Sequence, residues 1–138
     1  MWRVFLGLVF VSCAGESQHA PFQITLSRGG GFSGFFRGYH LYEGGRIEAW
    51  SHMPGKRDSV LWQTQVHPDS IGRLRDGLER SGALEIVHRS NGNMTTHVSY
   101  STDDTTFSWS WGNLGPQNLE DWYSRANRFC AHVEPVEE

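Results

Sequence analysis

The sequence predicts an α+β fold, in which an antiparallel β-sheet of about five to six strands carries two helices packed on one face. Three observations lead to this prediction. Apolar and polar residues alternate in several short segments, as they do in half-buried strands. Two other segments, which begin near residues 67 and 117, repeat apolar residues at helical spacing. The chain has the usual length of one domain and contains no internal repeat.

The N-terminus has the pattern of a secretory signal segment. Arg3 precedes an apolar run over residues 4–11, and the small residues Ser12, Cys13 and Ala14 follow it. The run is about half of the roughly 20 residues that a membrane-spanning helix needs. We therefore expect an exported protein with a signal peptide and possible lipobox at residues 1–13 and a polar tether at residues 14–21.

Three ways of processing this segment remain open. Cleavage before Cys13 would leave a lipid on that residue and anchor the domain to a membrane at the cell envelope, although Phe10 and Ser12 depart from the usual lipobox. Cleavage after Ala14 would give a periplasmic or secreted protein. Only an uncleaved chain could form a disulfide between Cys13 and Cys130. Since the sequence has just these two cysteines, no disulfide framework holds the fold.

The first half of the domain reads as a series of strands. Residues 22–27 alternate, the glycine-rich residues 28–34 interrupt this strand, and residues 35–42 resume extended character. Residues 43–46 form a hairpin turn, residues 47–50 the returning strand and residues 51–58 a loop. A fourth strand is expected over residues 60–66.

A helix is expected to begin at Pro68, because proline at the first helical position and Asp69 in the first turn are start signals. Ser81 and Gly82 provide the stop. A short strand over residues 84–87 is expected to follow. The apolar residues at helical spacing are Ile71, Leu74 and Leu78.

The second half contains the clearest hairpin, formed by residues 96–100 and 107–111 around a turn at residues 102–105. Phe107, Trp109 and Trp111 alternate with small polar residues, which favours a stripe buried under the helices; an exposed stripe would instead be a ligand platform. A final helix carries an apolar stripe that includes Cys130. We expect one domain over residues 22–132, followed by an acidic tail at residues 133–138.

Motifs for catalysis and metal binding are lacking in the sequence. The seven histidines stand apart and form no metal-binding motif, so no metal site or cofactor is expected. No serine occupies a nucleophile elbow, and neither cysteine has a catalytic motif around it, which predicts a protein that is not an enzyme. With 12 basic and 15 acidic side chains, the chain lacks the basic excess that a nucleic-acid binder needs.

The glycine-rich segment is the candidate binding site. It is not a phosphate-binding P-loop, because no Lys and Ser or Thr end it and a strand follows it instead of a helix. It is either a structural turn that allows two strands to approach closely, or a backbone-exposing loop that contacts a partner. Its residues are Arg28, Gly29, Gly30, Gly31, Phe32, Ser33 and Gly34.

Residues 22–37 resemble the opening of the emfourin-type family, whose members are small bacterial inhibitors of thermolysin-like metalloproteases. That family opens with a strand, an Arg-Ser-Gly-Gly-Phe-Ala-Gly-like loop and a second strand. Here Gly29 replaces the usual Ser and Ser33 the usual Ala. The matching positions are Arg28, Gly30, Gly31, Phe32 and Gly34.

The resemblance implies a binding module without catalytic residues of its own, with a metalloprotease as its protein partner. We therefore expect an exported, non-enzymatic module that inhibits such a protease through its glycine-rich loop. The alternative is a cell-envelope lipoprotein that binds another protein or a surface glycan through its aromatic residues.

Overall fold

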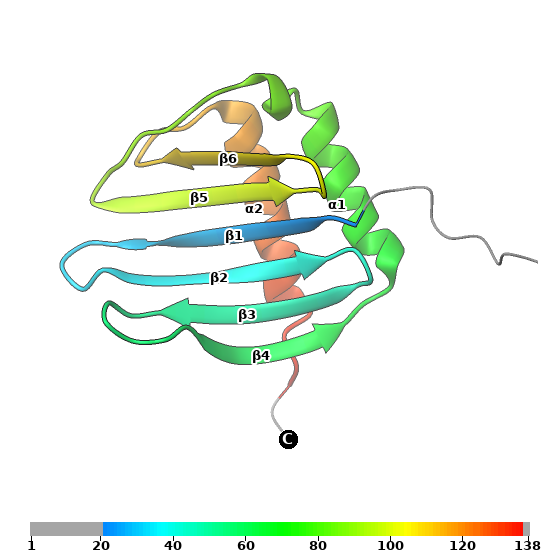
Figure 1. Cartoon of the computed structure of the whole chain (residues 1–138), viewed down its shortest axis with the longest axis horizontal. Helices are drawn as coiled ribbons and strands as arrows, with labels where there is room; N and C mark the ends of the chain where they lie inside the picture. The colour runs from blue at the N-terminus through cyan, green and yellow to red at the C-terminus, as the bar shows by residue number, and fades with distance from the viewer. Residues whose placement is uncertain (1–20, 137–138) are drawn as a thin grey trace, which may run out of the picture.

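The computed structural model describes residues 21–136, which form an antiparallel sheet covered on one face by two helices (Figure 1). This confirms the α+β prediction. The signal segment, Cys13 and all of the tether except Pro21 lie outside the described residues, as do the last two residues of the tail. The elements are β1 (Gln23–Gly30), β2 (Phe35–Tyr42), β3 (Arg46–His52), β4 (Ser59–Gln65), α1 (Pro68–Arg80), the 3₁₀ helix η1 (Ala83–Glu85), β5 (Met94–Ser101), β6 (Thr106–Trp111) and α2 (Gln117–His132).

The six strands are ordered β4-β3-β2-β1-β5-β6, and each neighbouring pair is antiparallel. Strands β1 to β4 follow one another as a meander, whereas β5 and β6 form a separate hairpin on the other side of β1. Helix α1 links the two groups. Because α1 and α2 both lie behind the sheet in Figure 1, one face is covered and the other is open.

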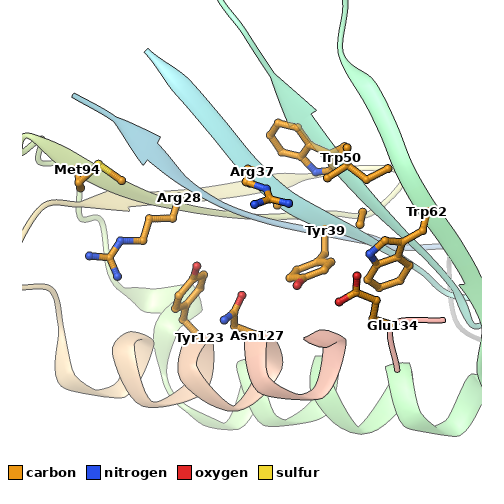
Figure 2. Close-up of a pocket in the computed structure, with 12 residues that line it drawn as sticks. Arg28, Arg37, Tyr39, Trp50, Trp62, Met94, Tyr123, Asn127 and Glu134 are labelled. Carbon is orange, nitrogen blue, oxygen red and sulfur yellow. The ribbon is translucent and has the colours of Figure 1, made fainter. Parts of the chain in front are cut away.

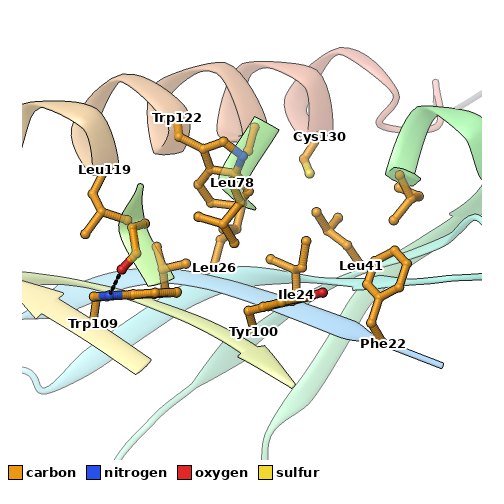
Figure 3. Packing of buried hydrophobic residues seen from close by; sticks show 14 of the residues in the cluster. Phe22, Ile24, Leu26, Leu41, Leu78, Tyr100, Trp109, Leu119, Trp122 and Cys130 are labelled. Atoms are coloured by element: carbon orange, nitrogen blue, oxygen red, sulfur yellow. Dashed lines mark hydrogen bonds between the residues drawn. The ribbon is translucent and has the colours of Figure 1, made fainter. Parts of the chain in front are cut away.

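The core lies between the sheet and the two helices (Figure 3). Two of the three residues of the predicted aromatic stripe on β6 are buried, with Trp109 and Trp111 at most 3% exposed, whereas Phe107 is half-buried. Ser108 on the opposite face is exposed. The largest side chains with less than 2% exposure are those of Trp109, Trp122, Ile24, Leu26, Leu41, Ile47, Ile71, Leu78, Leu119, Val98 and Cys130.

Both tryptophans that are central to this core also donate hydrogen bonds. The indole Nε1 of Trp122 donates to the backbone oxygen of Leu74 in α1, at 2.8 Å, which joins the two helices. The indole Nε1 of Trp109 donates to the backbone oxygens of Ala83 at 3.1 Å and Ile86 at 2.9 Å. Trp109 therefore ties the segment after α1 to the sheet.

Helix α1 begins and ends where the sequence predicts. The Nδ1 atom of His67 accepts a hydrogen bond from the backbone N–H of Asp69 at 3.1 Å, and Pro68 is the first helical residue. The prediction of a strand over residues 84–87 was wrong. Gly82, at φ +83°, ends the first helix and opens η1, and the bonds to Trp109 hold this segment against the sheet in a non-strand conformation.

The first strand is longer than the sequence predicts, because β1 runs through Arg28, Gly29 and Gly30. These residues have partners on both sides, in β2 and in β5, which supply backbone hydrogen bonds despite the low strand preference of glycine. The interruption predicted over residues 28–34 is therefore confined to a four-residue turn, Gly31 to Gly34.

Cys130 lies on the buried face of α2, as the spacing predicts, and burial raises the pKa of its thiol to about 12. It is therefore protonated at neutral pH and packs as a small apolar residue.

Candidate functional site

One end of the sheet gathers half of the large exposed apolar side chains of residues 21–136. The β1–β2 turn, the β3–β4 loop, the segment before β5 and the segment after β6 all lie at the left in Figure 1. We call this region, residues 31–34, 53–58, 91–94 and 112–116, the loop end. Its large exposed apolar side chains are those of Phe32, Met53, Met94 and Leu114.

The turn at the centre of the loop end is held from several directions. The backbone N–H of Gly31 donates to the backbone oxygen of Asn93 at 2.6 Å, and that of Gly34 donates to the oxygen of Gly31 at 3.3 Å. The Oγ atom of Ser33 accepts from the backbone N–H of Phe35 at 3.3 Å. Gly31 and Gly34 have φ angles of +69° and +61°, which other residues adopt only with strain. The turn is therefore fixed in shape before any partner binds.

Phe32 stands at the tip of this turn and is fully exposed to solvent. An apolar ring in this position does not stabilise the folded state, since hydrophobic side chains stabilise a protein when they are removed from water. Pro54 packs under the turn so closely that a Cβ on Gly34 would lie 2.8 Å from its Cγ atom. The turn that carries the Phe32 ring is therefore packed against Pro54.

A cleft of about 470 Å³ opens next to the loop end, between the sheet and α2 (Figure 2). Arg28 and Tyr123 lie at one end of it, and Trp62 and Glu134 lie at the other. The lining residues are Arg28, Arg37, Gly38, Tyr39, Ala49, Trp50, Leu61, Trp62, Met94, Tyr123, Asn127 and Glu134.

Two arginines from neighbouring strands line this cleft, Arg28 at one end and Arg37 nearer the middle (Figure 2). Arg28 and Arg37 are direct cross-strand partners in β1 and β2, and both are exposed. Like charges placed directly opposite each other destabilise a sheet. Within residues 21–136, neither guanidinium forms an ion pair or a side-chain hydrogen bond. The fold therefore carries this pair at a cost, and the pair is available to an anionic group.

The phenol groups of the cleft remain protonated at neutral pH. Burial raises the pKa of Tyr39, and the negative charge of Glu134 adds to this while Arg37 opposes it. Burial also raises the pKa of Tyr123, against the opposing effect of Arg28. Both hydroxyl groups can therefore donate hydrogen bonds to a ligand.

The structure separates the seven residues of the candidate binding site into three groups. Gly29 and Gly30 are strand residues, and a Cβ on Gly29 would lie 2.1 Å from the backbone oxygen of Phe35, which supports the structural interpretation for them. Gly31 to Gly34 form the exposed turn. Arg28 points away from that turn into the cleft.

Sequence reasoning missed most of the cleft. No sequence motif marks Arg37, Tyr39, Tyr123 or Asn127 as site residues. One signal was present: in a hairpin centred on residues 31–34, Arg28 pairs with Arg37. Glu134 belongs to the predicted acidic tail, and no pattern in the sequence placed it beside the sheet.

The open face of the sheet carries a second group of aromatic side chains. His40 stacks on Trp50, with ring centroids 5.2 Å apart, and its Nδ1 lies 2.9 Å from the Oγ1 atom of Thr25. The ring of His97 packs against that of Phe36, with ring centroids 5.6 Å apart. Burial lowers the pKa of both histidines, and for His40 the nearby Glu48 partly opposes this.

This arrangement predicts a pH dependence of stability. His97 favours its neutral form in the folded protein, whereas the unfolded chain binds a proton near pH 6.5. The unfolded state therefore takes up more protons, and the free energy of unfolding should fall as the pH drops from about 7 to about 5. His97→Gln should make this decline shallower in urea titrations at several pH values, while Ser99→Ala, on the same strand and face, should not. Equal slopes in the two variants would contradict the assignment.

Neither a metal-binding cluster nor a membrane-spanning helix is present in residues 21–136. No three His, Cys, Asp or Glu side chains in residues 21–136 are grouped so that they could hold a metal ion. Neither helix in this range is long and apolar enough to cross a bilayer. Comparison with known protein families found no family model that matches the chain, and comparison with curated proteins found no match either.

Proposed function

We propose that this chain is an exported, non-enzymatic binding module that inhibits a thermolysin-like metalloprotease through the turn at Gly31 to Gly34. The observation that carries this proposal is the fully exposed ring of Phe32, held at the tip of a turn with a fixed shape. The resemblance of residues 28–34 to the emfourin-type loop supports the choice of partner.

The energetics favour Phe32 as the anchor of such an interface. Burial of apolar surface stabilises a complex by roughly 25 cal/mol per Å², and aromatic side chains are common among the residues that dominate binding. Because Gly31 and Ser33 already hold the turn in place, little conformational entropy is lost on binding. Met94 and Leu114 are further exposed apolar side chains of the loop end.

The experiment is an inhibition assay of the mature protein against a panel of thermolysin-like proteases. Loss of a central aromatic anchor costs at least about 2 kcal/mol, so Phe32→Ala should raise the inhibition constant about 30-fold or more. Its thermal unfolding should be nearly unchanged, because the ring is outside the core. Val87→Ala is the matched control, since Val87 is 90% exposed but lies outside the loop end.

Failure of the wild-type protein to inhibit any protease of the panel would overturn the metalloprotease proposal. The alternative function, a cell-envelope lipoprotein that binds another protein or a glycan, would then be tested by cross-linking the wild type and the Phe32→Ala variant in cell-envelope extracts. If a protein other than a protease is captured by the wild type and not by the variant, the loop end is still the binding surface, but the partner is not a metalloprotease.

A further inference from the structure

We propose that the cleft between the sheet and α2 binds a short zwitterionic peptide, with the peptide carboxylate at Arg28 and Arg37 and its ammonium group between Trp62 and Glu134. This inference rests on the cleft alone and does not depend on the proposed function of Phe32. The argument follows the cleft from its positive end to its negative end (Figure 2).

The positive end has the donors that a carboxylate requires. Arg28 lies at one end of the row of side chains in Figure 2, and Arg37, its partner residue on the neighbouring strand, lies nearer the middle. Neither has an ion-pair partner in residues 21–136. Guanidinium groups bind carboxylates through paired, charge-assisted hydrogen bonds. The side chains of Tyr123 and Asn127 lie on the α2 side of the same space and can add neutral donors. A carboxylate here would also relieve the repulsion between the two arginines.

The opposite end has the chemistry of a cation site. Glu134 is the only acidic residue among those lining this cleft. It lies near the aromatic pair Tyr39 and Trp62, whose ring centroids are 5.8 Å apart. Aromatic faces attract ammonium groups, and a nearby carboxylate adds to that attraction. The negative charge also keeps a second anion away from this end.

The separation of the two ends selects the class of ligand. A free amino acid carries its ammonium and carboxylate on one carbon, whereas Arg28 and Glu134 lie at opposite ends of the row of side chains in Figure 2. A peptide of a few residues places the two charges apart, and its amides can bond to the Asn127 side chain, which both donates and accepts. The volume of about 470 Å³ is in the range of small-ligand sites.

A smaller cleft of about 330 Å³ adjoins the first and shares Arg28, Tyr123 and Asn127 with it. Glu120 lines its far side, where its Oε1 accepts a hydrogen bond from the backbone N–H of Gly115 at 2.9 Å. Arg28, which lines both clefts, therefore lies between Glu120 of the smaller cleft and Glu134 of the first cleft, which favours placement of the ligand carboxylate at Arg28.

The test is an NMR titration of the full chain with three probes: tetra-alanine, its N-acetylated form and its C-terminal amide. Tetra-alanine should bind most tightly, because it alone carries both charges. Each lost charge should weaken binding about two- to five-fold, as expected for partly solvated ion pairs. The largest shift changes should occur at Tyr39, Tyr123 and Asn127.

Two variants separate the two ends. Arg37→Gln should reduce the preference for tetra-alanine over its amide, since only Arg28 remains to bind the carboxylate, and Glu134→Gln should abolish its preference over the acetylated form. Arg125→Gln is the control, because Arg125 is an exposed arginine of α2 outside the cleft. Phe32→Ala should leave all three affinities unchanged, so this inference and the proposed function can fail separately.

Equal affinity for the three probes would overturn the proposal, as would shift changes located elsewhere on the domain. Absence of binding by all three probes up to their solubility limit would overturn it as well. Full retention of both preferences in Arg37→Gln and Glu134→Gln would show that the charges act elsewhere.

Discussion

Replacement of Trp109 by alanine is expected to lower the free energy of unfolding by about 3–5 kcal/mol. The side chain is 1% exposed and lies in the middle of the core, so its loss leaves a large cavity. It also removes the donor shared by the backbone oxygens of Ala83 and Ile86. Since domains are stable by only about 5–15 kcal/mol, this loss is a large fraction of the total stability. Urea unfolding followed by circular dichroism measures the change.

The Trp109→Phe variant separates the loss of packing from the loss of the hydrogen bonds. Phenylalanine keeps most of the apolar volume but cannot donate a hydrogen bond, so the loss should be about 1–3 kcal/mol. The segment around η1 should then exchange its amide hydrogens faster, because the bonds that tie it to the sheet are gone. Equal losses for the alanine and phenylalanine variants would contradict a major role for packing.

The second large effect is expected for Gly38→Ala in β2. A Cβ at this position would lie 1.9 Å from the backbone oxygen of Leu26 and 2.9 Å from the Cα of Ser27. These are backbone atoms of the central strand β1, which cannot rotate away as a side chain can. Backbone displacement at the centre of the sheet should cost about 3 kcal/mol or more.

Gly72→Ala is the matched control for this variant. Gly72 lies inside α1, where a Cβ would meet nothing within 4 Å. Alanine should stabilise the helix by about 0.5–1 kcal/mol. Thermal unfolding of the two variants should therefore shift in opposite directions. A neutral or stabilising result for Gly38→Ala would show that β1 and β2 are less closely packed at this point than the structure indicates.

Much of the fold could be predicted because its strands and helices have clear periodicities. Trp109 and Trp111 alternate with serines, and that pattern alone identified their strand and its buried face. Where the prediction failed, distant contacts decide the conformation. Ala83 to Glu85 are held in η1 by Gly82 and by the indole of Trp109, which is far away in the sequence.

The candidate site likewise has one part that could be predicted from the sequence and one part that could not. The exposed turn around Phe32 is a local feature, so glycine spacing was enough to find it. The cleft is a product of strand register and helix placement, which bring Arg28 opposite Arg37 and set Tyr123 and Asn127 of α2 above them. No local pattern specifies how α2 crosses the sheet, and the cleft could therefore not be read from the sequence.

The central position of β1 also constrains the order of folding. Its first neighbour, β2, follows directly along the chain, but its second neighbour is β5, where Gln23 pairs with Ser101 and Gly30 with Met94. One side of the central strand therefore stays unpaired until most of the chain has been synthesised. Closing such a long loop is costly in chain entropy and slows folding. The meander of β1 to β4 can form early, and the sheet is completed only when the β5–β6 hairpin arrives.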